Sequence, residues 1–146
     1  MNNYLKLFIP LFLLAFSLEG FSNKIEINLS TGGTLSEFTS SDEALNADSI
    51  IVTGGVTLTS DDFLAIKKLL VSYKLVYVDI YETANSSIGT EVFLGCTRLV
   101  GFRFPKRLTS IGRYCFRDCN NLKNIYFPNT LNSFGVGVFR SCGLKK

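Results

Sequence analysis

Few side chains in this sequence are of the types that carry catalysis. The chain has no histidine, which excludes nucleophiles activated by histidine and most zinc sites. Asp61 and Asp62 are adjacent carboxylates, but acids directly ahead of an apolar run are explained by the start of a helix, where negative charge suits the helix dipole. The glycine pairs at 32–33 and 54–55 lack the spacing and the following lysine of a phosphate loop, and they indicate turns. We therefore predict no enzyme activity and no cofactor.

Four cysteines are the remaining candidates for chemistry. Four thiols in an exported protein usually form disulfides. Cys96, Cys119 and Cys142, however, follow one another at intervals of 23 residues, and Cys115 occupies a small interior position of the same pattern. This spacing favours buried free thiols and no metal site, because stacked positions point in parallel and do not converge on an ion. A Cys96–Cys119 disulfide stays open as an alternative, since strands about 4.8 Å apart place neighbouring positions within reach.

The cysteine spacing is part of a longer repeat that runs from residue 88 to residue 146. Ile88, Ile111 and Phe134, each followed by glycine, are 23 residues apart. Further apolar positions recur in step with them: Phe93, Phe116 and Phe139; Leu99 and Leu122; Phe102 and Ile125; Phe104-Pro105 and Phe127-Pro128; Leu108 and Leu131. A fixed period of this length is typical of a solenoid, in which each coil is stable only when it is stacked on the next. The pattern fails at Leu144, so the region holds two full copies and one partial copy.

Within each copy, the apolar spacing predicts a short strand followed by a turn. The pattern Leu99-x-x-Phe102-x-Phe104 directs alternate side chains inward, as expected of parallel strands in one sheet. Pro105 ends the strand because proline cannot donate a hydrogen bond to the ladder. Between residues 111 and 119 the inward positions take a helical spacing, which predicts a turn of helix. The expected fold class is an α/β repeat, a solenoid with a parallel β-sheet face and short helices or turns opposite.

These residues resemble a known family. The segment IGRYCFRDCNNLKNIYFPNTLNSFG, at 111–135, is similar to the leucine-rich repeats of the bacterial surface protein A type, whose copies follow the pattern I-G-x-x-A-F-x-x-C-x-x-L-x-x-I-x-L-P. The similarity extends over residues 88–146. The resemblance implies an extracellular leucine-rich-repeat domain used for adhesion and recognition, with no catalytic residues.

Residues 23–87 carry the same strand pattern at longer intervals, and we interpret them as an N-terminal capping region with early coils. Strands are predicted around Ile50 and Val78, and a first strand is predicted around Ile25 and Ile27. A short turn or helix is expected at 33–38. A longer helix should begin with Ser60 as its N-cap. Its apolar face consists of Phe63, Ile66, Leu69, Leu70 and Tyr73.

The N-terminus has the pattern of an export signal. Lys6 precedes the apolar run 7–16, which is too short to span a bilayer. Gly20 and Ser22 are the small residues that a signal peptidase needs, so we place the signal peptide at 1–22; an uncleaved N-terminal anchor is the alternative. No other segment reaches the roughly 18 apolar residues of a membrane span. We expect a secreted or cell-surface protein without a membrane span after signal removal.

Charge and strand direction indicate where a partner would bind. Residues 23–91 contain four cations and ten acids, whereas residues 92–146 contain ten cations and one acid, so a partner of the repeat half is expected to be anionic. The side chain between the two inward ones on each strand points outward. This predicts a row of neighbours on an exposed sheet face: Ile51, Asp79, Arg103 and Tyr126. Arg98 and Lys123, at the starts of two strands, are weaker candidates.

Two functions follow as hypotheses. The first is a non-catalytic binding module that engages an extracellular protein or an acidic glycan through the outward row. The second is a structural, self-associating unit in which the acidic half of one copy meets the basic end of another. A truncated fragment of a longer surface protein belongs to the same alternative. The row could equally be a solvated sheet face with an Asp79–Arg103 cross-strand pair. Nucleic acid is not expected as a partner.

Overall fold

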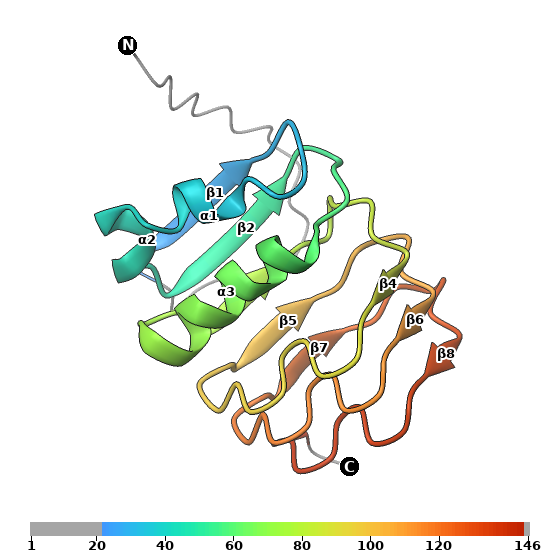
Figure 1. Ribbon diagram of the computed structural model, residues 1–146. Coiled ribbons are helices and arrows are strands. Elements are labelled where there is room, and N and C mark those ends of the chain that lie inside the picture. Colours follow the sequence, from blue (N-terminus) through green and yellow to red (C-terminus); the bar gives the residue numbers. More distant parts are fainter. Residues whose placement is uncertain (1–21, 145–146) are drawn as a thin grey trace.

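The computed structural model describes residues 22–144, so the predicted signal peptide, apart from Ser22, lies outside the described residues. The chain winds into a solenoid that carries a five-stranded parallel sheet in the order β1-β2-β3-β5-β7 (Figure 1). These strands are β1 (Lys24–Asn28), β2 (Ser49–Thr53), β3 (Tyr77–Asp79), β5 (Gly101–Arg103) and β7 (Asn124–Tyr126). Their spatial order follows the chain, as stacked repeats require, and the predicted parallel sheet is confirmed.

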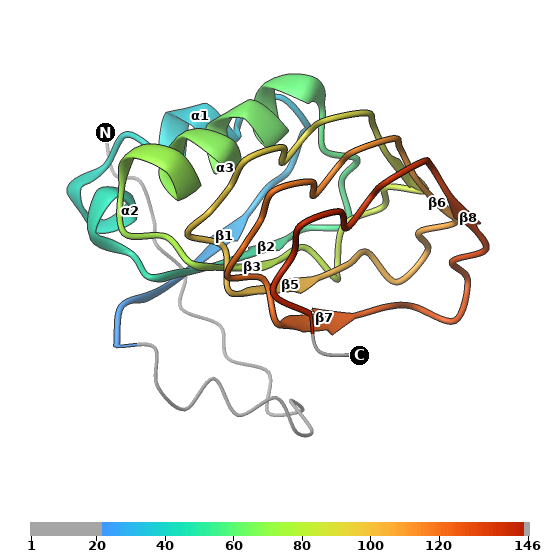
Figure 2. The same ribbon diagram turned by 90° about the horizontal axis from the view of Figure 1, so that it is seen from below.

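A second parallel ladder lies where each later coil turns back over the sheet (Figure 2). It consists of β4 (Ser87–Ile88), β6 (Ser110–Ile111) and β8 (Ser133–Phe134). Ile88 pairs with Ile111, and Ile111 pairs with Phe134, so the ladder aligns the start of each 23-residue copy. The sequence does not predict this ladder, because strands of two residues produce no detectable alternation.

The predicted columns of apolar side chains form the core. The ring of Phe116 is stacked between the rings of Phe93 and Phe139, with centroid separations of 5.2 and 5.6 Å. A second column, on the main sheet, follows the strand register through Ile50, Val78, Phe102 and Ile125. The phenylalanine column takes one residue from each of the 23-residue copies, and the sheet column takes one residue from each of its four strands. Most of the apolar surface of a coil is therefore buried by its neighbours.

The predicted turn of helix between residues 111 and 119 is instead a series of turns. Tyr114 and Asp118 have φ angles of 53° and 62°, in the left-handed region that interrupts a right-handed helix. Their amides donate to the next coil, at the carbonyls of Val136 and Arg140, and not back along a helix. Positive φ angles recur at the equivalent residues 91, 95, 137 and 141. On this side of the solenoid the backbone completes its hydrogen bonds between coils.

All helices of the described part of the chain lie in its N-terminal half. They are α1 (Leu35–Phe38), α2 (Asp42–Asn46) and α3 (Ser60–Ser72), and Figure 2 shows them on the face of the sheet that the turns of the later coils also cover. The apolar face of α3 is packed as predicted, but its N-cap is Thr59, one residue before the predicted Ser60. The unpredicted helix α2 is capped by the Ser41 hydroxyl. None of the helices in residues 22–144 is long and apolar enough to cross a membrane.

The Asp62 carboxylate joins α1 to α3. It accepts hydrogen bonds from the amides of Gly33 (2.6 Å), Leu35 (2.9 Å) and Thr59 (2.8 Å). Burial by itself raises the pKa of the Asp62 carboxyl, but these hydrogen bonds to the ionised form outweigh burial, and the pKa lies below its ordinary value. The interpretation of this acid as a helix-start residue is confirmed.

The glycine at the start of each copy is explained by the small distance between coils. A Cβ at Gly112 would lie 2.5 Å from the carbonyl carbon of Gly89, and a Cβ at Gly135 would lie 2.3 Å from the Arg113 nitrogen. At Gly89, in the first copy, the nearest atom would be a methyl group of Val92 at 3.6 Å. A side chain at 112 or 135 would therefore force neighbouring coils apart.

We expect Gly112→Ala to lower the free energy of unfolding by roughly 1 to 3 kcal/mol, because the added methyl group meets backbone that cannot rotate away. Gly89→Ala is the matched control, since it makes the same change at the same repeat position where space is open. Its unfolding free energy should stay within about 1 kcal/mol of the parent. Urea denaturation measures both variants, and equal losses would show that coil spacing does not require glycine.

Candidate functional site

The outward residues of the main sheet form the row that the sequence predicts. In the strand register Arg103 stands between Asp79 and Tyr126, and Ile51 lies on the far side of Asp79. The row has a fifth member, because Glu26 is paired in register with Ile51. Sequence reasoning missed Glu26 because the first strand was recognised from its two inward isoleucines, without an alignment to the later strands.

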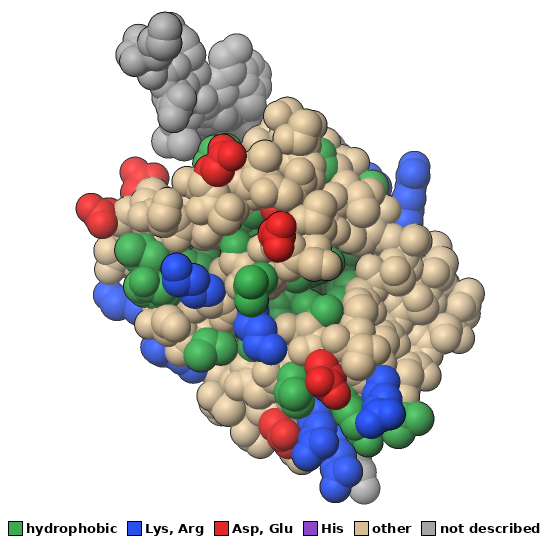
Figure 3. All heavy atoms as spheres, in the orientation of Figure 1, with side chains coloured by type: hydrophobic (Ala, Val, Ile, Leu, Met, Phe, Trp, Pro, Cys, Tyr) green, Lys and Arg blue, Asp and Glu red, His purple; other side chains and the backbone are tan. Residues whose placement is uncertain are grey.

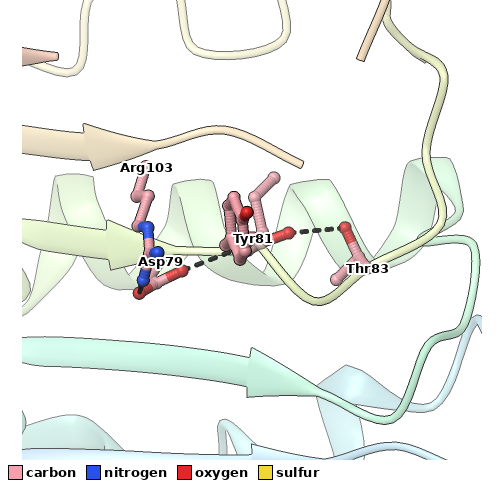
Figure 4. A network of polar contacts seen from close by, with 5 residues as sticks. Asp79, Tyr81, Thr83 and Arg103 are labelled. Carbon is pink, nitrogen blue, oxygen red and sulfur yellow. Dashed lines mark hydrogen bonds and ion pairs between the residues drawn. The ribbon is translucent and has the colours of Figure 1, made fainter. Parts of the chain in front are cut away.

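The middle of this row is covered, contrary to the predicted open face. Asp79 is only 4% exposed. One of its carboxylate oxygens accepts a 3.2 Å hydrogen bond from Nη1 of Arg103, and the other accepts a 2.9 Å hydrogen bond from the Tyr81 amide. The Arg103 guanidinium also lies 4.0 Å from the centre of the Tyr81 ring (Figure 4). Arg103 and Tyr81 have longer side chains than Asp79 and cover it. The alternation of side chains along a strand does not reveal this kind of burial.

The Asp79–Arg103 ion pair changes what the row can recognise. Burial raises the pKa of the Asp79 carboxyl, and the Tyr81 amide and the Arg103 guanidinium oppose that rise. The predicted cross-strand pair is therefore present, and it neutralises the one cation of the row. Arg103 offers a planar guanidinium held by Asp79 and Tyr81 instead of an isolated positive charge.

A shallow depression of about 210 Å³ lies at the carboxyl ends of β3, β5 and β7. Its lining consists of Tyr81, Arg103, Phe104, Tyr126, Phe127 and Pro128. Tyr126 and Phe127 are 46% and 47% exposed, whereas Phe104 is buried. Exposed aromatic rings beside an arginine are typical of surfaces that bind proteins. The volume is below the roughly 300 Å³ at which small-molecule pockets begin, so the shape suits a side chain of a macromolecule.

Comparison with known proteins identifies the family. The model of the BspA-type leucine-rich repeat region matches residues 71–146, just over half of the chain. The chain belongs to the BspA-type leucine-rich-repeat family. Among solved structures it is similar to the leucine-rich repeat protein of T. pallidum, with a TM-score of 0.48 and 19% identity; the match covers 80% of this chain and 47% of that one, so the chain spans about half the length of that protein. No curated protein sequence matches it.

Membership in this family sets a coarse function. Leucine-rich-repeat proteins generally act in protein interaction and are typically non-catalytic. The matched leucine-rich-repeat region begins at residue 71, inside the segment 23–87 that the sequence predicts to be a cap with early coils. The main sheet thus includes strands on both sides of that boundary.

The two weaker candidates lie apart from the depression. Arg98 and Lys123 are exposed and precede β5 and β7, whereas the depression lies beyond the last residues of these strands. The fold therefore places Arg98 and Lys123 at the opposite ends of β5 and β7 from Arg103 and Tyr126. Arg98 and Lys123 are exposed cations that do not line the depression.

A larger hollow of about 600 Å³ lies beside α3, and Figure 3 shows it lined partly by hydrophobic side chains. Its walls come from the start of α3 and from residues 85–92, which are distant in sequence, so no local motif predicts it. The Asn85 amide in its wall is used internally, since it donates to the Leu58 carbonyl and accepts from the Leu58 amide, both at 2.9 Å. This polar group holds the wall together and is not directed at a ligand.

All four cysteines are free thiols, as their spacing predicts. Burial raises the pKa of Cys96 to about 11 and that of Cys115 to about 12. A hydrogen bond between the thiols of Cys119 and Cys142, together with burial, raises the pKa of Cys119, and the same hydrogen bond lowers the pKa of Cys142. Within residues 22–144 there is no cluster of three or more side chains that could hold a metal ion.

We expect Cys142 to react first with a thiol reagent, because it is the one partly exposed cysteine in residues 22–144 and its pKa is lowered. The other three thiols should react only as the protein unfolds. The measurement is the time course of labelling, followed by a thiol count in denaturant without reductant. Cys142→Ser should remove the fast phase alone. Two or fewer thiols in the denatured parent would show that a disulfide forms.

We expect Arg103→Ala to lower the free energy of unfolding by about 2 kcal/mol at pH 7, because it leaves the buried Asp79 carboxylate unpaired. Without Arg103 the pKa of Asp79 rises further above its unfolded value. The folded state then takes up a proton first as the pH falls, so the deficit should shrink between pH 7 and pH 4.

Lys106→Ala is the control for this pH dependence. It removes an exposed ion pair with Glu82, 2.7 Å long, and should cost under about 1 kcal/mol. Urea denaturation at the two pH values compares the variants. An Arg103→Ala deficit that does not change with pH would show that Asp79 does not depend on its partner.

Proposed function

We propose that this chain is a non-catalytic, secreted or cell-surface leucine-rich-repeat protein that binds an extracellular protein at the depression beside Tyr126. The observation that carries this proposal is the grouping of two half-exposed rings, Tyr126 and Phe127, with Arg103. Arg103 is already held by Asp79 and Tyr81, so little side-chain freedom is lost when a partner contacts it. Rigid aromatic and arginine side chains of this kind supply most of the energy in protein interfaces.

Export is supported by the sequence pattern of residues 1–22 and by the adhesion role that the family resemblance implies. The leader contains one cation followed by a short apolar run and small residues. Adhesion is the form of recognition that we propose for a surface protein of this kind. An acidic glycan is the alternative ligand.

The partner that we propose carries an acidic surface. Residues 92–146 hold ten cations and one acid. Arg98 and Lys123 are exposed and lie outside the depression, so they would attract such a surface over a distance mainly at low salt, because the screening length falls to about 8 Å at physiological salt. Attraction of this kind raises the association rate more than it strengthens the final contact.

The test begins with residues 23–146 applied to an array of extracellular proteins and acidic glycans. Against the protein that binds, Tyr126→Ala should raise Kd at least tenfold, because an anchoring ring is lost. Val71→Ala is the matched control, since Val71 is a 54% exposed apolar residue on α3 that lines neither the depression nor the larger hollow, and its Kd should not change. The double variant Arg98→Ala, Lys123→Ala should slow association at low salt only.

Two results would contradict this function. Unchanged affinity of Tyr126→Ala for every bound protein would mean that the sheet face is an ordinary solvated surface. Binding to acidic glycans alone would replace the protein partner with the alternative ligand.

A further inference from the structure

The second ladder has an outer edge in the middle of the chain. β4 pairs with β6, and Figure 1 shows β4 at the edge of its ladder nearer to α3. The coil before β4 contains α3 on this side of the solenoid and no strand of the ladder. The hollow of about 600 Å³ is lined by both α3 and β4. It is open because a helix replaces a strand there, and not because of where the sequence begins or ends.

The backbone at this edge has hydrogen-bonding groups that the next copy uses between coils. In that copy the Gly112 amide donates to β4 at 2.8 Å, and the Arg113 carbonyl accepts from the Glu91 amide at 3.0 Å. The equivalent groups, 23 residues earlier, are the Gly89 amide and the Thr90 carbonyl. Neither group makes a hydrogen bond within residues 22–144, and both residues are exposed. The edge beside α3 thus has a free donor and a free acceptor.

The space beside this edge is the space that a strand fills in the later copies. A Cβ at Gly112 would lie 2.5 Å from the backbone of the preceding copy, and a Cβ at Gly135 would lie 2.3 Å from it. A Cβ at Gly89 would meet only a methyl group of Val92, at 3.6 Å. The volume of about 600 Å³ also lies within the range of roughly 300 to 1,000 Å³ that is typical of ligand sites. An extended backbone therefore has room beside β4.

The α3 wall adds a preference for certain side chains. Leu64 is 64% exposed, and Lys67, about one turn later, is partly exposed and makes no ion pair within the described part of the chain. Both residues line the hollow, whereas the exposed acids Asp61 and Glu91 do not. Figure 3 shows hydrophobic side chains in the hollow. An apolar side chain together with a carboxylate would complement this wall.

The direction of α3 fixes the order in which a bound segment would meet these two contacts. Leu58, just before the helix, is hydrogen-bonded to Asn85, and farther along the helix the Phe63 ring meets the Phe93 ring. α3 therefore runs in the same direction as β4 and the turn after it. A segment that continues the ladder runs parallel to β4, because β4 and β6 are parallel. It would meet the leucine of the wall before the lysine.

We propose that the hollow binds an extended peptide segment of a partner protein, which pairs with the outer edge of β4 in the parallel direction. The backbone of the segment bonds to the Gly89 amide and the Thr90 carbonyl, and this pairing supplies affinity. An apolar side chain against Leu64 and a later carboxylate against Lys67 supply specificity. The hollow shares no lining residue with the depression beside Tyr126, so this site does not depend on the proposed function.

The first test uses synthetic peptides and residues 23–146, a segment that contains the whole described core. The peptides have blocked ends and are rich in threonine, which favours extended backbone. Each contains one leucine followed by one glutamate, separated by one to three residues. At least one peptide should bind in a fluorescence anisotropy titration. The same peptide with glutamate ahead of leucine should bind about tenfold more weakly, because its charge meets the apolar part of the wall. Decanoate, an apolar anion without amides, should not displace the peptide.

The second test probes the backbone pairing and needs no variant of the chain. A strand directs the amides of alternate residues to opposite edges, so only every second amide of the peptide can reach β4. A single N-methyl group is placed on each peptide amide in turn. Kd should rise by about tenfold at alternate positions, because each of these methyl groups removes a hydrogen bond and leaves its partner unpaired.

The third test exchanges charge on α3. Lys67→Glu should raise the Kd of the glutamate peptide about tenfold, and a peptide with lysine in place of glutamate should bind this variant better than it binds the parent. Lys68→Glu is the matched control, since Lys68 is an exposed neighbour that does not line the hollow and the change in net charge is identical. Its affinity for the glutamate peptide should stay close to that of the parent. Circular dichroism confirms that both variants are folded.

Four outcomes would overturn this site. The first is a set of peptides of which none binds. The second is displacement by decanoate, which would make the hollow a pocket for small apolar anions. The third is an effect of N-methylation that does not alternate, and the fourth is equal weakening by Lys67→Glu and Lys68→Glu. Each of these would leave the proposed function intact, because the effect of Tyr126→Ala is measured on a different partner.

Discussion

The structure depends on the close stacking of one coil upon the next. Burial at any repeat position is decided by the presence of a neighbouring coil and not by the residue type alone. Phenylalanine is buried at residue 104 and half exposed at the equivalent residue 127. The same stacking requires glycine where two backbones meet, as at Gly112, and it directs the amides of Tyr114 and Phe116 to the following coil. A single coil would have neither a core nor a complete set of hydrogen bonds.

The N-terminal half supplies the first surface on which the repeats stack. The ring of Phe63 on α3 meets the ring of Phe93 edge to face, with a centroid separation of 5.9 Å, so the helix continues the phenylalanine column of the repeats. Asp62, one residue earlier, is held by hydrogen bonds to α1 and to the N-cap of α3. A carboxylate that fixes the start of the helix therefore also fixes the position of the first coil. The fold and the proposed binding surface share this dependence, because the outward row begins on strands of the N-terminal half.

The sequence predicts those features that depend on a residue type recurring at the same position of every copy. The inward columns recur at a fixed period, and so the strands, their parallel order and the row containing Arg103 and Tyr126 could be derived from it. Features that depend on neighbours in space could not. The burial of Asp79 results from Arg103 and Tyr81 lying over it, and Tyr81 stands at the position that Pro105 and Pro128 occupy in the later copies, so the repeat does not predict a ring there. The turns at 111–119 appear helical in side-chain spacing, and only the backbone angles of Tyr114 and Asp118 distinguish the two.

The proposed binding surface lies beside the last strand of the described sheet. Tyr126 lines the depression and is also the outward residue of β7. Arg103, its neighbour in the register, is held by Asp79 and by the Tyr81 ring, so this wall of the depression is fixed by contacts within the sheet. The register that stacks each coil on the one before it therefore also decides which side chains a partner can contact.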